Sequence, residues 1–249
     1  MKILISPSKT QNLNIKNKSS SESNIFFKSE TKQINQTLLE NIDNKNFNKF
    51  LEIKNSSLKE QTIFNIKNYE TNQSYYAIEF YDGLQFKNIE YDLISQQEKN
   101  LLNQSLIIIS AYYGIVFCNS YIKPYRLMLG SQIEINNQSL YEFWFKKFNQ
   151  KLLEINPDKT IINLASAEYS KLIDYSMFKV IDIDFKLLKN GKYVSMSTYS
   201  KQCRGNFIKN FLKVNLNIKE IAKLDILGFT YNKDLSNETK IIFTKNYEK

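Results

Sequence analysis

The segment ILISPSKT, Ile3–Thr10, begins the succession of strands and helices that determines the fold of this 249-residue chain. Lys2–Ser6 carries a run of apolar, partly β-branched residues of strand length. Pro7 follows, and because proline has no backbone N–H it suits the end of a strand. The segment therefore predicts a short strand that ends in a polar turn.

This polar turn brings several hydrogen-bond donors together. Ser6, Ser8 and Thr10 contribute hydroxyls, and Lys9 contributes an ammonium group. Such donors, with the backbone amides of the turn, suit the oxygens of a phosphate or carboxylate. The GxxxxGK[ST] pattern of a nucleotide-binding loop is absent. The turn is thus a candidate anion-binding site, and an ordinary strand-ending turn with a solvated lysine is the alternative.

Beyond this strand, the chain alternates helical and strand patterns. Gln11–Glu30 is polar and predicts an extended loop, whereas apolar residues recur at helical spacing over Thr31–Leu51 and predict two short helices. A serine followed three positions later by a glutamate predicts helix starts at Ser57, Ser95 and Ser139. Further helices are expected at Gly205–Val214 and Ile218–Leu224, and further strands at Leu106–Tyr112, Thr160–Leu164, Met177–Leu188, Lys192–Tyr199, Ile226–Tyr231 and Lys240–Thr244.

This order of elements predicts a mixed α/β fold of the α+β class. No internal repeat, long linker or break in composition divides the chain, so we expect residues 1–249 to form a single compact domain. Leu102–Val116 also allows a helix-hairpin-helix interpretation around Tyr113-Gly114-Ile115. The β-branched run before this hairpin favours a buried strand that ends at Gly114.

Composition and charge narrow the classes of function. The chain has no histidine, which excludes Ser-His-Asp and Cys-His catalysis and HExxH zinc sites. Its 34 Lys and Arg against 25 Asp and Glu give a net charge of +9, which favours phosphate-rich or other anionic partners. A biased genome composition, rich in Lys, Asn and Ile, is the alternative source of this excess.

Cysteine spacing and the length of apolar runs bear on cofactors and location. Cys118 and Cys203 form no CxxC pair, so neither a zinc site nor a disulfide framework is indicated, and no metal or other cofactor is expected. Lys201 and Arg204 near Cys203 favour a reactive thiolate, but a semi-buried thiol is the simpler interpretation. No apolar run approaches the roughly 20 residues of a membrane-spanning helix, and no signal-peptide pattern is present. We therefore expect a soluble, cytoplasmic protein with no membrane partner.

Five short segments occur in an order that is typical of one protein family. They are ILISPSKT (Ile3–Thr10), PYRLMLG (Pro124–Gly130), LYEFW (Leu140–Trp144), NLASAEY (Asn163–Tyr169) and KQCRG (Lys201–Gly205). SAYYGIV (Ser110–Val116) and the pair Gly228-Phe229 extend the match over essentially the whole chain. Together these segments resemble the YaaA family of peroxide-stress proteins.

The resemblance implies a mixed sheet flanked by helices, a basic cleft, DNA binding, and protection against peroxide by limiting free intracellular iron. Two positions depart from the family pattern. Phe117-Cys118 stands where the family usually has Arg-Pro after its Tyr-Gly pair, and Met128 stands where it usually has an acidic residue. The first departure removes one candidate phosphate ligand.

Two of the motifs carry arginines suited to an anion. Arg126 follows Pro124-Tyr125, whose extended backbone favours a rigidly presented guanidinium, and a structural ion pair is the alternative. Lys201 and Arg204 precede the helix predicted to begin at Gly205, so they suit a phosphate at the amides of a helix start. A solvated basic helix face is the alternative there.

Glu168 is the best candidate for an acidic residue in the same site. It follows the strand predicted at Thr160–Leu164. The positive charges of Lys9, Lys201 and Arg204 would keep a nearby carboxylate ionised, and such a carboxylate either orients these cations or acts as a base.

The leading prediction is a DNA-binding protein of the peroxide stress response. In it Lys9, Arg126, Lys201 and Arg204 line a cleft and bind backbone phosphates with little sequence specificity. The alternative is an enzyme that acts on an anionic or nucleotide-like small molecule in the same cleft, with Glu168, Lys9 and Tyr125 as candidate catalytic residues. Direct iron binding is not indicated, because the sequence has no histidine and no cluster of Cys or carboxylate ligands.

Overall fold

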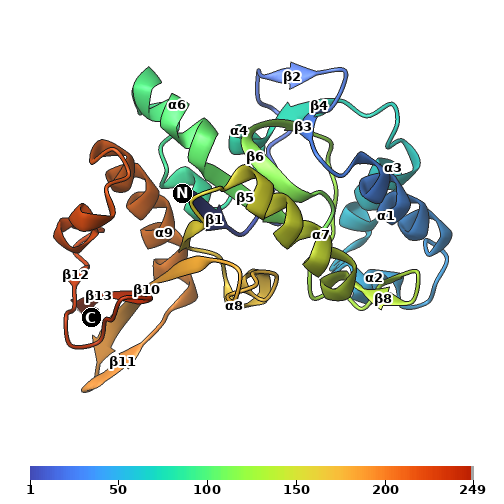
Figure 1. Cartoon of the computed structure of the whole chain (residues 1–249). Helices are drawn as coiled ribbons and strands as arrows, with labels where there is room; N and C mark the ends of the chain where they lie inside the picture. Colours follow the sequence, from blue (N-terminus) through green and yellow to red (C-terminus); the bar gives the residue numbers. More distant parts are fainter. Residues whose placement is uncertain (248–249) are drawn as a thin grey trace.

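The computed structural model of the chain describes residues 1–247 and is built around a central strand, β1 (Lys2–Ile5). β1 pairs in parallel with β5 (Leu106–Ser110) on one side and with β9 (Thr160–Asn163) on the other. The apolar residues of β1 and all of β5 are buried, as expected for parallel strands covered on both faces. The strand predicted at the start of the chain is therefore confirmed, and it lies in the middle of the sheet (Figure 1).

One mixed sheet runs through the molecule. Its strand order is β12-β13-β10-β9-β1-β5-β6-β4-β2, with β11 paired to β10 and β3 paired to β6. The strands from β13 to β5 in this order are parallel to one another, and β6 and β4 continue the sheet in antiparallel pairs. The other strands are β2 (Lys18–Ser19), β3 (Ser23–Ile25), β4 (Ser74–Tyr76), β6 (Gly114–Ile122), β10 (Lys179–Lys189), β11 (Lys192–Val194), β12 (Thr230–Tyr231) and β13 (Lys240–Asn246), with a separate hairpin of β7 (Glu134–Ile135) and β8 (Gln138–Ser139).

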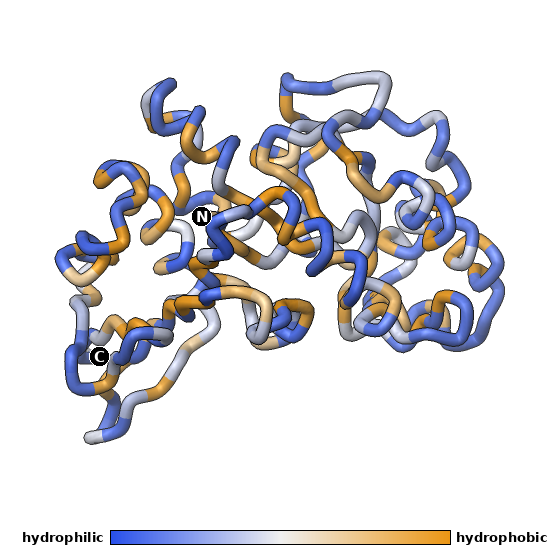
Figure 2. Tube along the Cα trace, viewed as in Figure 1, coloured by the Kyte–Doolittle hydropathy of each residue, from blue (hydrophilic) through white to orange (hydrophobic). Residues whose placement is uncertain are grey.

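Helices flank this sheet, with α9 beside β10–β13 at one end and α1–α3 at the other (Figure 1). Hydrophobic residues follow the central strands and the helix faces toward them (Figure 2), and the buried apolar side chains form one contiguous core. The structure thus confirms the mixed α/β fold. The helices are α1 (Lys28–Glu40), α2 (Phe47–Phe50), α3 (Ser56–Lys67), α4 (Ala77–Phe80), α5 (Leu84–Lys87), α6 (Gln96–Ser105), α7 (Leu140–Ile155), α8 (Ala167–Ser170), α9 (Ser197–Lys213) and the 3₁₀ helix η1 (Ile218–Lys223).

Two of the three predicted capping boxes are present. Ser95 and Ser139 each accept a hydrogen bond from the backbone N–H of the glutamate three residues on, whose side chain bonds back to the serine N–H. The box predicted at Ser57 is wrong, because Asn55 caps α3 by accepting a hydrogen bond from the Leu58 N–H. Asparagine is as good a cap as serine, so the helix begins earlier.

The β5–β6 hairpin replaces the strand expected to end at Gly114. β5 stops at Ser110 because its hydroxyl accepts hydrogen bonds from the N–H groups of Tyr112 and Tyr113 and so closes a turn. Gly114 has φ +69° and starts β6. The segment is a β-hairpin, and no helix-hairpin-helix forms in it.

Three other boundaries differ from the sequence prediction. The segment Gln11–Glu30 contains β2, β3 and the start of α1, so it is not only a loop. The strand predicted at Ile226–Tyr231 is shortened to β12, because Leu227 and Gly228 both have positive φ and form a turn. The Asn190-Gly191 turn between β10 and β11 is confirmed.

The start of α9 is the correction with most bearing on function. The strand predicted at Lys192–Tyr199 ends at Val194, and α9 begins at Ser197 instead of Gly205. One face of α9 is buried and carries Ser200, Cys203 and Phe207. Because Ser200 and Cys203 continue this buried face before Gly205, the helix extends further toward the N-terminus than predicted. Among the described residues, no helix has the length and apolar character needed to cross a membrane.

Candidate anion-binding site

The strand order changes direction at β1. From β1 the chain first reaches β5 on one side and only later reaches β9 on the other. In open α/β sheets, ligands bind in the crevice outside the carboxyl ends of strands at such a point. The residues that follow β1 and β9 therefore occupy the most favourable place for a ligand in this fold.

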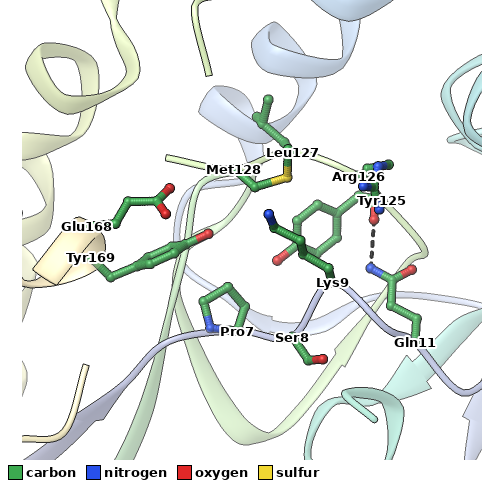
Figure 3. Close-up of a pocket in the computed structure, with 10 residues that line it drawn as sticks. All are labelled: Pro7, Ser8, Lys9, Gln11, Tyr125, Arg126, Leu127, Met128, Glu168 and Tyr169. Carbon is green, nitrogen blue, oxygen red and sulfur yellow. Dashed lines mark hydrogen bonds between the residues drawn. The ribbon is translucent and has the colours of Figure 1, made fainter. Parts of the chain in front are cut away.

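A pocket of about 60 Å³ lies at this place, and we refer to it as the switch-point pocket. Three segments contribute to it: the turn after β1, the loop after β6, and α8 after β9 (Figure 3). Its lining residues are Pro7, Ser8, Lys9, Gln11, Tyr125, Arg126, Leu127, Met128, Glu168 and Tyr169. The structure thus brings together Lys9, Tyr125, Arg126 and Glu168, which were singled out in separate motifs.

The carboxyl ends of β1 and β9 are held together by two serines. The Ser166 N–H donates to the Ser6 hydroxyl oxygen at 2.8 Å, and the two hydroxyls lie 3.1 Å apart. Ser6 therefore joins the two strand ends and does not line the pocket. Thr10 does not line it either, because its backbone N–H donates to the Ser8 hydroxyl and its carbonyl accepts from Asp82.

Lys9 forms an ion pair with Glu52, which follows α2. Both side chains are about half exposed, at 54% and 48%. The hydrogen bond from Lys9 lowers the pKa of the Glu52 carboxyl, so the carboxylate is ionised at neutral pH. Exposed pairs of this kind contribute about 0–1 kcal/mol, so Glu52 holds Lys9 only weakly.

Arg126 is held by the end of α2. Its Nε donates to the Leu51 carbonyl at 2.7 Å and its Nη2 donates to the Glu52 carbonyl at 2.8 Å. The guanidinium therefore satisfies backbone carbonyls that a helix end leaves free. The hydrogen-bond partners of Arg126 are thus backbone carbonyls. Burial lowers the pKa of Arg126, and the charge of the nearby Glu52 carboxylate partly offsets this shift.

Tyr125 lies at the inner wall of the pocket. Its hydroxyl is 2.8 Å from the Tyr81 hydroxyl and 2.9 Å from the Ser110 hydroxyl. Burial raises the pKa of Tyr125 to about 12, so the phenol keeps its proton at neutral pH. Tyr125 is consequently a hydrogen-bonding group and a poor base.

Glu168 faces the pocket from α8. Its Oε1 accepts a hydrogen bond from the Gly130 N–H at 2.9 Å, which fixes the carboxylate at the end of the loop that carries Arg126. Figure 3 shows Glu168 and Arg126 on opposite sides of the pocket, with the Lys9 side chain between them. Of the three cations expected near Glu168, Lys9 alone shares this pocket with it.

Lys201 and Arg204 lie elsewhere, on α9. Because α9 begins at Ser197, both are inside the helix, and the phosphate seat expected at a helix start beside them is wrong. Lys201 is exposed, whereas Arg204 is partly buried and its buried Nε has no hydrogen-bond partner in residues 1–247. Burial raises the pKa of Cys203 to about 12, so the thiol is not the reactive thiolate considered from the sequence.

Two residues of this region were missed by the sequence analysis. Tyr169 lines the pocket and directly follows Glu168 in a motif already singled out, so its place was within reach. Glu52 gives no sequence signal, since its position depends on how α2 packs and on its positive φ of 49°. Among residues 1–247, no group of three or more Cys, Asp or Glu side chains is arranged to hold a metal ion.

Comparison with known proteins agrees with the motifs. The family model for peroxide stress protein YaaA matches residues 1–235. A UPF0246 protein of Malacoplasma penetrans is 63% identical over 248 residues, covering 99% of this chain and 100% of the relative. UPF0246 proteins of Fusobacterium nucleatum and Clostridium botulinum are 35% and 31% identical, each covering 98% of this chain and 99% of the relative. The chain therefore belongs to the YaaA family of peroxide stress proteins.

Proposed function

We propose that this chain is a cytoplasmic DNA-binding protein of the peroxide stress response, which holds backbone phosphates at and around the switch-point pocket. The observation that carries the proposal is the placement of Lys9 and Ser8 at the pocket in a chain with a net charge of +9. Six lysine side chains form ion pairs within residues 1–247, so most of the cationic groups there are available to phosphates.

The size of the pocket favours contact with phosphates over contact with bases. Its volume of about 60 Å³ is small, so it suits a single phosphate oxygen better than a nucleobase. An oxygen of a phosphate is small enough to reach the Lys9 ammonium. Binding of this kind depends on charge and carries little sequence specificity.

The connection to iron is part of the proposal. Residues 1–247 offer no cluster of metal ligands, so we attribute protection to the DNA that the protein covers, which iron-derived oxidants then reach less readily.

Salt dependence tests the proposal. Binding of a duplex is measured over a range of salt concentrations for the unaltered protein, Lys9→Gln and Lys233→Gln, an exposed lysine outside the pocket. A protein that makes several phosphate contacts loses affinity steeply as salt rises, and loss of one contact lowers the slope by about one. We expect Lys9→Gln to weaken binding and Lys233→Gln to have little effect. A flat salt dependence, or equal effects of the two substitutions, contradicts the proposal.

A second candidate is an enzyme acting on an anionic or nucleotide-like small molecule. The observation in its favour is Glu168, whose carboxylate stands at a pocket with Tyr125 and Tyr169, although a phosphate clamp needs no carboxylate. Glu168→Gln separates the two functions. The substitution leaves duplex affinity equal or higher if phosphates are the ligand, and abolishes turnover of a phosphorylated substrate if the pocket is catalytic.

A further inference from the structure

The chain uses arginine at two positions only. Of its 34 cationic residues 32 are lysines, and the arginines are Arg126 and Arg204. A guanidinium differs from an ammonium in offering a rigid fork of donors, so arginine is needed where two acceptors must be bound together. Arg126 fits this rule, because its fork binds two successive carbonyls.

Arg204 has no such acceptors in the protein. It is partly buried on α9, its buried Nε has no hydrogen-bond partner, and within residues 1–247 its guanidinium forms neither a hydrogen bond nor an ion pair. Burial lowers its pKa and the charge of Asp184 opposes this shift, but arginine keeps its proton at neutral pH. The Nε donor is buried without an acceptor, and no group within residues 1–247 occupies the rest of the guanidinium, which leaves it available to an acceptor from outside the chain.

The backbone holds Arg204 in place. A Cβ on the neighbouring Gly205 would lie 2.0 Å from the Gln85 carbonyl oxygen, so α9 touches α5 backbone to backbone at this turn. The Gln85 side-chain amide in turn reaches the Ser6 carbonyl, at 3.5 Å, where β1 ends. The turn that carries the guanidinium is therefore fixed to the same edge of the sheet as the switch-point pocket, although Arg204 does not line that pocket.

We infer that Arg204 is the centre of a second oxyanion site, which takes the phosphate group of a ligand through two parallel N–H···O bonds. The fork of a guanidinium matches two oxygens of a phosphate. Lys201 is exposed one turn earlier on α9, and the positive charge of Lys245 acts on the neighbouring Cys203, so two further cations lie near Arg204. Asp184 is the carboxylate that acts on Arg204, and it weakens phosphate binding there.

An internal arrangement is the competing explanation. In it a water molecule bridges Arg204 to Asp184 and no ligand is involved. The two explanations differ in what removal of the Asp184 charge does: at an oxyanion site Asp184→Asn tightens phosphate binding, and in a water-bridged pair it only destabilises the fold.

Thermal unfolding with inorganic phosphate as the probe tests the inference. Phosphate replaces chloride at constant ionic strength, so that a saturable rise of Tm reports specific binding. We expect this rise in the unaltered protein and in Lys213→Gln, which removes an exposed charge from the same helix. Arg204→Lys keeps the charge but loses the fork, and we expect it to bind phosphate about tenfold or more weakly.

Three results overturn the inference: no saturable response to phosphate, an undiminished response in Arg204→Lys, or an Asp184→Asn variant that loses stability without binding phosphate more tightly. If Arg204→Lys folds poorly, Asp184→Asn alone still decides between the explanations. A short DNA duplex in place of phosphate then identifies the source of the phosphate group. Weaker duplex binding by Arg204→Lys assigns it to a nucleic acid backbone, and unchanged duplex binding assigns it to a free phosphate ester.

Discussion

Tyr125→Phe removes one oxygen atom from a buried hydrogen-bonded cluster at the switch-point pocket. The Tyr125 hydroxyl joins those of Tyr81 and Ser110, and these two residues are 1% and 0% exposed. The Ser110 oxygen already accepts from two backbone N–H groups, so its own hydrogen is directed at Tyr125. After the substitution, the Tyr81 hydroxyl and the Ser110 proton both lose the hydrogen bond that they form with Tyr125.

The expected loss of stability follows from these two groups. A buried polar group left without a partner costs about 1–3 kcal/mol, so two such groups should lower the free energy of unfolding of Tyr125→Phe by about 2–6 kcal/mol. The double variant Tyr81→Phe/Tyr125→Phe leaves only the Ser110 hydroxyl without a partner, so it should lose only about 1–3 kcal/mol. The double variant is therefore expected to be more stable than Tyr125→Phe alone.

Urea denaturation of the three variants measures these differences, provided that the slope m is unchanged. Tyr199→Phe is the matched control, since Tyr199 is 37% exposed and its hydroxyl forms no hydrogen bond within residues 1–247. Surface changes of this kind usually stay within about 0.5 kcal/mol. A loss below about 0.5 kcal/mol in Tyr125→Phe, or strictly additive losses in the double variant, would refute this account of the hydroxyl cluster.

Three further predictions concern packing, pH and the ion pair at the pocket. Gly205→Ala places a methyl group 2.0 Å from a backbone carbonyl oxygen, so we expect a loss of stability at or above the usual cost of overpacking, about 1–3 kcal/mol, seen as a lower Tm. Gly191 has open space around it but φ +73°, so the control variant Gly191→Ala should lose only about 1–2 kcal/mol of stability. Hydrogen bonds from Ser95 lower the pKa of Glu98, so the ionised Glu98 side chain stabilises the folded protein. This contribution to stability is complete above the pKa of the unfolded state and disappears as pH falls through the lowered value. Glu98→Gln should therefore flatten the acid limb of a plot of Tm against pH, and an unchanged limb contradicts the assignment. Glu52→Gln removes the ion pair with Lys9 and leaves the ammonium free for a phosphate. Because exposed ion pairs are worth at most about 1 kcal/mol, duplex affinity should rise by up to about fivefold at low salt. Weaker binding would show that Glu52 supports the site.

Local chemistry explains which parts of the fold were predictable. Pro7 and the capping boxes at Ser95 and Ser139 act through neighbours in sequence, so their elements were expected where the structure has them. The start of α9 depends instead on Cys203 and Phe207 being buried beneath the helix, which strand-like residues before Ser197 obscured. Long-range packing decided that boundary.

In the candidate site too, local sequence predicted some of the residues and long-range packing decided the others. Motifs that follow strand ends were expected to meet, and Lys9 and Glu168 do meet, because β1 and β9 are adjacent and parallel. Arg204 was expected with them, but the longer α9 places it away from the pocket. Glu52, just after α2, is 43 residues from Lys9 in sequence, so only tertiary packing creates their contact.

The central position of β1 also affects how the protein is made. Its partners are at residues 106–108 and 161–163, so the first strand to be synthesised is completed on both sides only after most of the chain exists. At roughly 5–20 residues per second, translation leaves this apolar strand without its second neighbour for on the order of ten seconds. During that interval at least one of its edges can pair with other nascent chains. Slower synthesis lengthens the exposure, so the yield of soluble protein should depend on translation speed and on chaperones that bind the emerging N-terminal segment.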